Sequence, residues 1–353
     1  MRVRTLIDNL PSGTVLNPSI DAERKLTSLE DGIGRQVTYL RLSVTDRCDL
    51  RCSYCMPKQM TFLPKNELLS FNELHRIAQA FMQRGVRKIR LTGGEPLVRR
   101  EIMQLVETLG TYTTSGALDE LTLTTNGTQL EKYAGRLFAA GIRRINVSLD
   151  HLDPEKYRDI TRGGDVHKVL SGIVAASKAG LKIKINAVAM TGFNLDHIDG
   201  LMQWAHGRGH DLSVIEAMPL GDSGSDRAAS FASLKTMRSD LENRFSLTPS
   251  NHKTSGPSRY FDVKETGGRI GFISPLSDHF CATCNRVRLT CTGQLYACLG
   301  HEGAVDLRGI LRAGGDLNGA IDKALHFKPE RHDFDALEPD RLATHRHMSV
   351  TGG

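Results

Sequence analysis

The segment Cys48-Asp-Leu-Arg-Cys52-Ser-Tyr-Cys55 follows an apolar stretch, Tyr39–Val44, that is predicted to be a β-strand. Each iron of a four-iron cluster takes one cysteine, so these three thiolates can hold three irons. No fourth cysteine lies nearby, which leaves the fourth iron open to a ligand that is not protein. A structural zinc site would need a fourth Cys or His, and the nearest downstream histidine is His75. A structural zinc or disulfide site remains the alternative.

A strand followed by a helix recurs along residues 39–218. Six apolar stretches are predicted strands: Tyr39–Val44, Val86–Leu91, Leu121–Thr124, Arg144–Leu149, Leu181–Met190 and Leu212–Met218. One predicted helix opens at Ser70, where Glu73 completes a capping box. The other predicted helices lie near Glu101–Leu109, Leu130–Ala139, Asp165–Ala179 and Asp196–Arg208, and the glycines expected to end helices are Gly85, Gly110, Gly141 and Gly180.

Repeated βα units predict a parallel sheet with right-handed crossovers. Six units are fewer than a closed eight-unit barrel, which takes about 250 residues. We therefore expect an α/β fold with a partial (β/α)6 TIM-like barrel of residues 36–220. A doubly wound open sheet is the alternative. Residues 1–35 are expected to be a peripheral arm, and residues 221–353 a C-terminal cluster-binding extension.

In either fold the functional face lies at the carboxyl ends of the strands. The cysteine segment follows the first strand there, and Thr92-Gly93-Gly94-Glu95-Pro96 follows the second. Two glycines allow backbone polar groups to approach a ligand closely, although a plain tight turn is the alternative.

Composition narrows the class of protein. The chain has 353 residues, 39% hydrophobic and 24% charged, and contains no run of 18 apolar residues. Seven cysteines in groups of three and four indicate metal binding in a reducing compartment, so we expect a cytoplasmic protein with no membrane span. The net charge of +6 suits an anionic ligand, and 6% aromatic residues offer no stacking platform for nucleic acid.

The second cysteine group contains Cys281, Cys284, Cys291 and Cys298. A zinc ribbon is one interpretation. Asn285-Arg286-Val287-Arg288-Leu289 follows at once, and a short strand, Gln294–Leu299, is expected to end at Cys298. Arg286 and Arg288 point to the same side of a strand, where two guanidiniums would bind a polyanion beside an open iron. The sequence thus favours a second cluster held by three cysteines, with Cys291 as a bystander in a turn.

The cysteine segment resembles the signature of the radical S-adenosylmethionine (SAM) superfamily. The chain also carries, in order, C-x3-C-x2-C, T-G-G-E-P, T-T-N-G, I-E-x-M and F-C-A-T-C-N-R-x-R. This combination resembles the GTP 3′,8-cyclase family, which catalyses the first step of molybdenum cofactor biosynthesis. The similarity covers about Thr38 to Gly353, and the Cys281–Cys298 block and the Gly352-Gly353 end are its family-specific parts.

The resemblance implies a role for each matching position. It implies two [4Fe–4S] clusters, one held by Cys48, Cys52 and Cys55 and one by Cys281, Cys284 and Cys298. Contacts with SAM would come from Tyr54, Gly94, Ser148 and Met218. Contacts with GTP would come from Arg41, Arg90, Thr124, Lys184, Arg286, Val287 and Arg288. Glu95 would either lie near the SAM ammonium or buttress the glycine turn.

Three of these basic residues, Arg41, Arg90 and Lys184, stand within predicted strands. Each has an alternative interpretation as a charge that extends to the rim. The other interpretation is that these cations line the inner face of the strands, where hydrogen bonds to a bound triphosphate would offset the cost of burying them.

The implied reaction removes hydrogen from C3′ of the GTP ribose, after which that carbon attacks C8 of guanine. An electron and a proton then complete (8S)-3′,8-cyclo-7,8-dihydroguanosine 5′-triphosphate. The resemblance also implies that the terminal glycines reach the active site. The implied partners are a reducing electron donor and the downstream cyclic pyranopterin monophosphate synthase, and a homodimer is the working expectation.

Two other classes remain open. One is a peptide-modifying radical SAM enzyme with an auxiliary cluster. Such an enzyme would not require the paired arginines Arg286 and Arg288. The other is a non-catalytic iron–sulfur or zinc protein, which would close both sites with four protein ligands.

Overall fold

The computed structural model describes residues 28–224, 227–334 and 342–352 of the chain. Most of the predicted N-terminal arm and the terminal Gly353 therefore lie outside the described residues. The part of the arm that is described packs on the body of the protein. Leu29 is buried and its N–H donates to the carbonyl of Arg84 at 3.1 Å, while Arg35 pairs with Asp31 at 2.6 Å.

The described strands form one open sheet in the order β12-β11-β10-β1-β2-β3-β4-β5-β6-β9-β8-β7. Their bounds are β1 Tyr39–Ser43, β2 Lys88–Thr92, β3 Glu120–Thr125, β4 Arg144–Ser148, β5 Lys182–Ala189, β6 Asp211–Glu216, β7 Leu247–Pro249, β8 Arg259–Val263, β9 Gly268–Ile273, β10 Arg286–Leu289, β11 Gln294–Tyr296 and β12 Ala304–Asp306.

Strands β1 to β6 are parallel and lie side by side in chain order. A doubly wound sheet reverses its strand order at a switch point, so the partial (β/α)6 barrel is confirmed and the alternative is wrong. The C-terminal region extends the same sheet at both ends. Strand β10 pairs in parallel with β1, and β9 pairs in parallel with β6.

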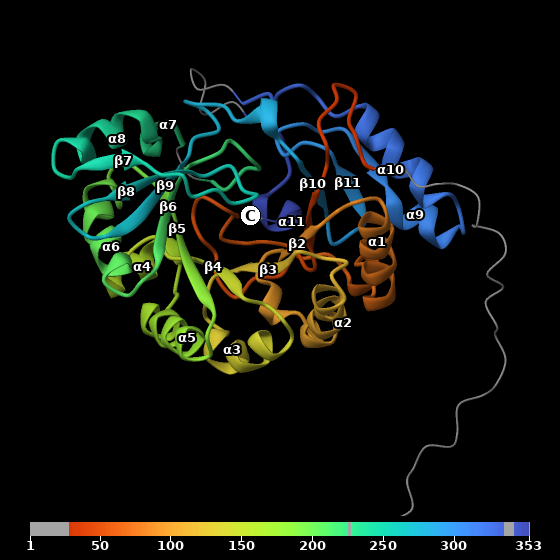
Figure 1. Ribbon diagram of the computed structural model, residues 1–353, viewed down its shortest axis with the longest axis horizontal. Coiled ribbons are helices and arrows are strands. Elements are labelled where there is room, and N and C mark those ends of the chain that lie inside the picture. The colour runs from red at the N-terminus through yellow and green to blue at the C-terminus, as the bar shows by residue number, and fades with distance from the viewer. Residues whose placement is uncertain (1–27, 225–226, 335–341, 353) are drawn as a thin grey trace, which may run out of the picture.

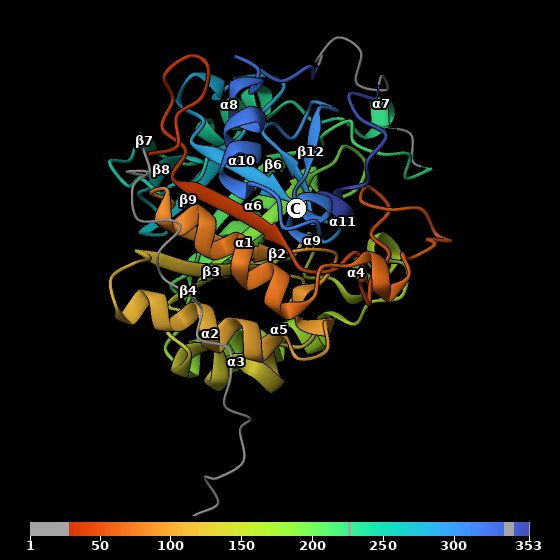
Figure 2. The same ribbon diagram turned by 90° about the vertical axis from the view of Figure 1, so that its right-hand side faces the viewer.

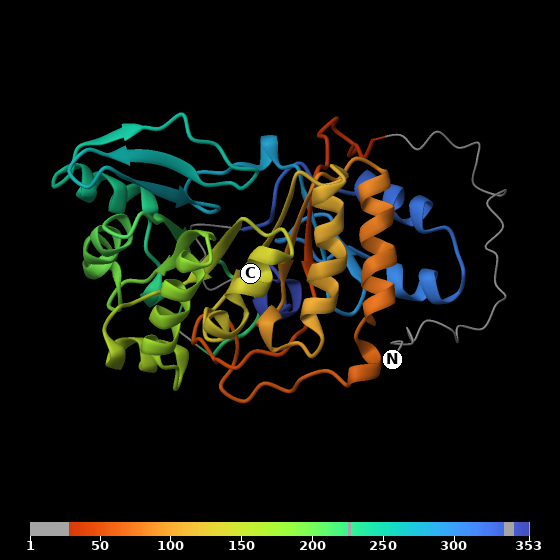
Figure 3. The ribbon, with the colours of Figure 1, turned by 60° about the horizontal axis from the view of Figure 1, so that its bottom comes forward.

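The described helices are α1 Phe71–Gln83, α2 Ile102–Thr114, α3 Leu130–Ala139, α4 Pro154–Thr161, α5 Val166–Lys178, α6 Ile198–His206, α7 Arg227–Ser230, α8 Leu234–Glu242, α9 Leu307–Arg312, α10 Leu317–His326 and α11 Met348–Thr351. Helices α1, α2, α3, α5 and α6 lie outside the arc of strands, whereas α11 lies within it (Figure 1). Figure 2 shows α1, α2 and α3 covering this outer face, and Figure 3 shows the β7–β9 strands at the opposite end of the molecule from α9 and α10.

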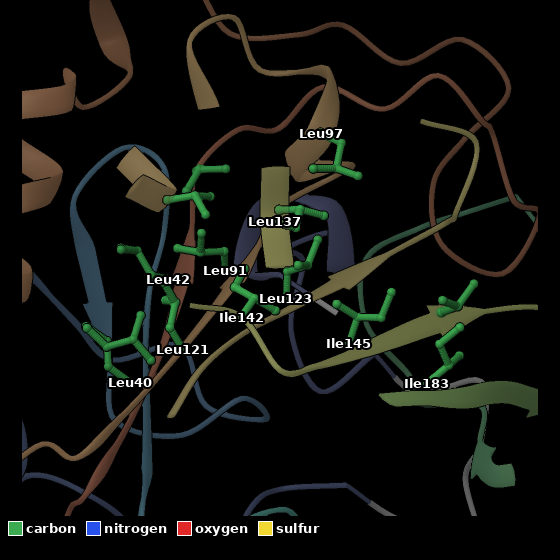
Figure 4. Close-up of a cluster of buried hydrophobic side chains, with 14 of the residues drawn as sticks. Leu40, Leu42, Leu91, Leu97, Leu121, Leu123, Leu137, Ile142, Ile145 and Ile183 are labelled. Atoms are coloured by element: carbon green, nitrogen blue, oxygen red, sulfur yellow. The ribbon is translucent and has the colours of Figure 1, made fainter. Parts of the chain in front are cut away.

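The alternation of side chains along each strand creates this arrangement. Leu40 and Leu42 point outward into the apolar core, while Arg41 between them points inward. Figure 4 shows the same outward layer continuing through Leu91, Leu121, Leu123, Ile145 and Ile183 toward Leu137 of α3. The inner face is left with polar side chains that line a cavity.

Several local predictions can be compared with the structure. The capping box of Ser70 and Glu73 is present at the start of α1. Gly85, Gly141 and Gly180 follow helices with positive φ, as expected. The prediction for Gly110 is wrong, because α2 continues to Thr114. A Cβ at Gly110 would lie 1.9 Å from the carbonyl oxygen of Ala140, so this glycine permits a close approach instead of ending the helix.

Candidate active site

One cavity of about 290 Å³ lies inside the arc of strands. The six cysteines that were predicted to hold clusters and nearly all predicted ligand-binding side chains reach it. The predicted residues that line it are Arg41, Cys48, Cys52, Tyr54, Cys55, Arg90, Gly94, Thr124, Ser148, Lys184, Met218, Cys281, Cys284, Arg286, Arg288 and Cys298. Val287 is the exception, because its side chain is buried in the apolar core on the other face of β10.

The first cysteine group lies in the loop after β1. All seven cysteines of the chain are free thiols, which is not the pattern of a disulfide framework. The Sγ of Cys48 accepts from the N–H of Leu50 at 3.4 Å and from Asn126 Nδ2 at 3.7 Å. Burial raises the pKa of Cys48 and of Cys55 to about 12, so a cationic ligand would be needed to hold these groups as thiolates.

The three cysteines of the first group all line the cavity. Among the described residues, no three His, Cys, Asp or Glu side chains form a group that could hold a single metal ion. Each iron of a cluster takes a different cysteine, so a cluster needs thiols that are spread around it. A cluster held by these three cysteines would leave its fourth iron open to the cavity.

Asp150, a residue that belongs to no predicted motif, orients Tyr54 beside this group. The Tyr54 hydroxyl donates to Asp150 Oδ2 at 2.8 Å, and the N–H of Val188 donates to Asp150 Oδ1 at 2.9 Å. Burial raises the pKa of Asp150 to about 6. A carboxylate directly after the predicted strand ending at Leu149 was the available signal.

The glycine turn packs against the backbone that leads into the cysteine segment. The N–H of Gly94 donates to the carbonyl of Thr45 at 2.8 Å, and a Cβ at Gly94 would lie 2.4 Å from the carbonyl oxygen of Arg47. Gly93 has φ +150°, and a Cβ there would lie 2.4 Å from the carbonyl oxygen of Thr45. The glycines are thus needed for contact between two loops, and they also line the cavity.

Glu95 buttresses this turn, which was one of its two expected roles. It is fully buried and accepts from the N–H of Leu97 at 2.9 Å, Thr125 Oγ1 at 2.8 Å and the N–H of Asn126 at 2.6 Å. Burial raises its pKa to about 7. Glu95 therefore fastens the loop after β2 to the loop after β3, and Asn126 of that loop contacts Cys48.

The second cysteine group lies across the cavity, in the segments that flank β10. Burial opposes ionisation of Cys284, but Arg286 and Lys328 outweigh it and lower the pKa to about 7. The Lys328 Nζ lies 3.6 Å from Cys284 Sγ and donates to the carbonyls of Arg286 at 3.2 Å and Ala297 at 2.7 Å. This cationic setting suits a thiolate ligand.

Two expectations about this region are refined by the structure. The strand expected to end at Cys298 ends at Tyr296, the last residue that pairs with both β10 and β12, so Cys298 lies in the following loop. Cys291 is fully buried in the turn after β10 and is not among the residues that line the cavity.

A set of cations forms the inner wall of the cavity. Arg41, Arg90 and Lys184 are 8%, 6% and 5% exposed, so the alternative of charges at the rim is wrong. Burial lowers the pKa of all three, and neighbouring cations lower it further. Burial and then Arg286 lower the pKa of Arg288 to about 10. So many close positive charges favour a polyanionic ligand.

The C-terminal helix α11 brings the end of the described chain to this wall. Arg288 Nη1 donates to the carbonyl of Gly352 at 2.5 Å, and Met348 lines the cavity. Other lining residues, none of which was a predicted ligand contact, are Asn126, Asn146, Asn186, His332 and Phe334. Asn126 belongs to the T-T-N-G motif, and the others had no spacing signal.

Comparison with known proteins identifies the family. A family model described as the Radical SAM superfamily matches residues 42–205, and one described as Molybdenum Cofactor Synthesis C matches residues 210–334. A GTP 3′,8-cyclase of Rhizobium etli (strain CIAT 652) is 59% identical over 92% of this chain and 94% of its own length. This chain belongs to the GTP 3′,8-cyclase family. The GTP 3′,8-cyclase of Agrobacterium fabrum is 56% identical over 95% of this chain and 98% of its own length.

Membership of this family, within the radical SAM superfamily, implies that the chain binds a [4Fe–4S] cluster and SAM. Solved structures support the fold alone. SuiB of Streptococcus suis bound to S-adenosylmethionine has a TM-score of 0.53 at 15% identity, covering 81% of this chain and 68% of SuiB. SuiB bound to the precursor peptide SuiA has a TM-score of 0.58, also at 15% identity, covering 81% and 66%. Among the helices that the structure describes, none has the length and apolar character needed to span a bilayer.

Proposed function

We propose that this chain is a radical SAM GTP 3′,8-cyclase that converts GTP into (8S)-3′,8-cyclo-7,8-dihydroguanosine 5′-triphosphate, the first step of molybdenum cofactor biosynthesis. The observation that carries this proposal is that two cysteine groups face one cavity whose wall is cationic. That wall presents Arg41, Arg90, Lys184, Arg286 and Arg288. One end of the cavity suits radical formation, and the other suits a nucleoside triphosphate.

At the first end, Cys48, Cys52 and Cys55 would hold the cluster that binds SAM. Tyr54, Gly94, Ser148 and Met218 line the adjoining part of the cavity and would contact SAM. SAM bound at a reduced cluster supplies a 5′-deoxyadenosyl radical for hydrogen abstraction. Asp150 fixes the Tyr54 hydroxyl by its 2.8 Å hydrogen bond, so the position of this contact is set before SAM binds.

At the second end, Cys281, Cys284 and Cys298 would hold a second [4Fe–4S] cluster. Free thiols around the cavity and the cationic setting of Cys284 support this assignment. We assign this cluster the role of an anchor for the guanine base of GTP.

The remaining GTP contacts are assigned along the barrel wall. Arg41, Arg90 and Lys184 would bind the triphosphate, since charge-assisted hydrogen bonds would relieve the cost of burying these cations. Thr124 has a buried hydroxyl without a hydrogen-bond partner among the described residues and would donate to the substrate. Arg286 and Arg288 flank Val287, whose contact with GTP would come from its backbone because its side chain is buried.

The wider setting is also proposed. Residues 36–220 would form the SAM-cleaving barrel, and residues 221–353 would supply the second cluster and the GTP site. Residues 1–35 would be a peripheral arm that is anchored to the barrel by its last residues, where Leu29 is buried. A reducing electron donor and the downstream cyclic pyranopterin monophosphate synthase are the expected partners. We expect a cytoplasmic homodimer with no nucleic-acid or membrane partner.

The test separates SAM cleavage from cyclisation. The protein is purified anaerobically, reconstituted with iron and sulfide, and reduced with SAM and GTP, and both 5′-deoxyadenosine and cyclised GTP are quantified. Arg286→Ala should reduce the cyclised product at least tenfold while SAM cleavage persists. Arg100→Ala, at an arginine whose side chain is 91% exposed, should change neither product and serves as the control. Formation of 5′-deoxyadenosine by the wild type with no change in GTP would contradict the proposed substrate.

A further inference from the structure

Asn146 in β4 is a buried amide that the protein itself leaves unsatisfied. Its side chain is fully buried, and neither Nδ2 nor Oδ1 has a hydrogen-bond partner among the described residues. An amide offers two donors and an acceptor with two lone pairs, so the whole hydrogen-bonding capacity of this side chain is unused. Asn146 also lines the cavity between the two cysteine groups.

A second buried asparagine shows what the fold does when an amide serves structure alone. Asn194 is 1% exposed, and its Nδ2 donates to the carbonyls of Asp150 at 3.0 Å and Val188 at 2.8 Å. Its Oδ1 accepts from the N–H of Met190 at 2.9 Å. Burying an amide without such partners is costly, so the unsatisfied state of Asn146 points to a ligand that completes it.

The place of Asn146 indicates which part of a ligand it meets. In the sheet register Asn146 lies opposite Thr124 of β3 and Lys184 of β5. Two residues further along β4 on the same face, roughly 6–7 Å away, is Ser148, at the SAM end of the cavity. Asn146 therefore lies between the cations that suit phosphates and the end where the radical would form.

The group of a nucleoside triphosphate that must lie between these two ends is the sugar. A ribose carries adjacent hydroxyls that both donate and accept hydrogen bonds, which matches the donor and acceptor of an amide. The neighbouring Thr124 hydroxyl is also buried without a partner among the described residues, so Asn146 and Thr124 together offer uncharged polar groups to a ligand.

We propose that Asn146 is a positioning residue that hydrogen-bonds the ribose hydroxyls of GTP and so fixes the orientation of C3′. This inference rests on the proposed function, because it takes GTP as the substrate. It predicts that the amide contributes to GTP binding through the sugar and contributes nothing favourable to the folded state without a ligand.

The test compares GTP with 2′-deoxy-GTP and 3′-deoxy-GTP by calorimetric titration of the reconstituted protein under anaerobic conditions, without reductant. The wild type should bind at least one deoxy analogue about five- to tenfold more weakly than GTP, the usual effect of one lost hydrogen bond. In Asn146→Leu that discrimination should disappear because GTP binds more weakly, while affinity for SAM is unchanged. Asn146→Gln should restore part of the discrimination. Asn243→Leu, at an exposed asparagine, should behave as wild type.

Stability without ligand provides the second readout. Asn146→Leu should keep or raise the melting temperature, because it replaces an unsatisfied amide with an apolar group of similar size, whereas Asn194→Leu should lower it. Retained ribose discrimination in Asn146→Leu, or loss of SAM affinity in place of GTP affinity, would overturn the inference while the proposed function stands. Failure of the wild type to bind GTP would overturn both.

Discussion

The guanidinium of Arg288 in β10 donates a 2.5 Å hydrogen bond to the backbone carbonyl of Gly352. Gly352 has φ +80°, and a Cβ at this position would lie 1.9 Å from Thr92 Oγ1. The end of the described chain is thus held by one of the proposed substrate arginines and passes so close to β2 that only glycine fits.

Gly352→Ala should displace the tail from Arg288 and strongly reduce formation of the cyclised product, at least tenfold. The matched control is Gly314→Ala, because Gly314 also has positive φ, at +69°, but has no atom near its Cβ position. Both variants place alanine at a positive φ and so carry similar backbone strain. Only Gly352→Ala adds a clash, between the new Cβ and Thr92. Product yield per 5′-deoxyadenosine is the measurement, and equal yields from the two variants would argue against a role for the tail.

Glu95→Ala should weaken the cysteine loop by removing the acceptor of three hydrogen bonds, two of them buried. We expect a loss of about 1–3 kcal/mol for each donor that is left unsatisfied, less any that water replaces. The melting temperature should fall, and the iron bound per chain after reconstitution should decrease. Glu131→Ala, at an exposed position in α3, should change neither quantity. Normal iron content in Glu95→Ala would refute the buttressing role.

Local sequence patterns predicted the barrel well because each unit is fixed by its own alternation and capping. The start of α1 at Phe71, after the Ser70 cap, and the full extent of α3, Leu130–Ala139, were both predicted. Helix α4 was missed, since Asp153 and Pro154 begin a short helix inside what looked like one connection. Gly110 was misread because its close neighbour, Ala140, is distant in the sequence.

Site residues could be predicted where they belong to a sequence motif. They could not be predicted where their role depends on contacts with residues that are distant in the sequence. The cysteines were predicted from their spacing, and the strand cations were predicted from the family resemblance, which their place within apolar stretches supported. Lys328 was not predicted, because the residues that it contacts are distant in the sequence: Cys284 is 44 residues away and Ala297 is 31 residues away. Asn146 carries no spacing signal either, and its importance appears only when its lack of partners is known.

Lys328→Met should loosen the second cysteine group while leaving the first intact. The substitution removes the ammonium beside Cys284 and its bonds to two backbone carbonyls. In a background in which Cys48, Cys52 and Cys55 are replaced by Ala, iron retention should fall and any remaining cluster should have a more negative reduction potential. Lys323→Met, at an exposed lysine of α10, is the control. Unchanged iron content and potential would contradict this role.

GTP binding should take up protons through Lys184. Burial lowers the pKa of Lys184 well below its usual 10.5, and the neighbouring charges are Arg90, Arg144 and Lys88, with Asp211 opposing. A bound triphosphate favours the charged ammonium and raises this pKa, so affinity should weaken as pH rises above the lowered value of the free protein. Calorimetry in buffers of different ionisation enthalpy measures the uptake. The proton uptake should vanish in Lys184→Met. It should persist in the control Lys168→Met, at an exposed lysine. Uptake that survives in Lys184→Met would show that another group takes up the proton.

The radical formed at the SAM end of the cavity should act on the ribose of a GTP molecule that is bound at the other end. The most direct test is to incubate the reduced, reconstituted protein with SAM and GTP deuterated at C3′, and to determine the mass of the 5′-deoxyadenosine formed. The 5′-deoxyadenosine should carry one deuterium and accumulate together with the cyclised product. Unlabelled 5′-deoxyadenosine, formed while GTP remains unchanged, would contradict it.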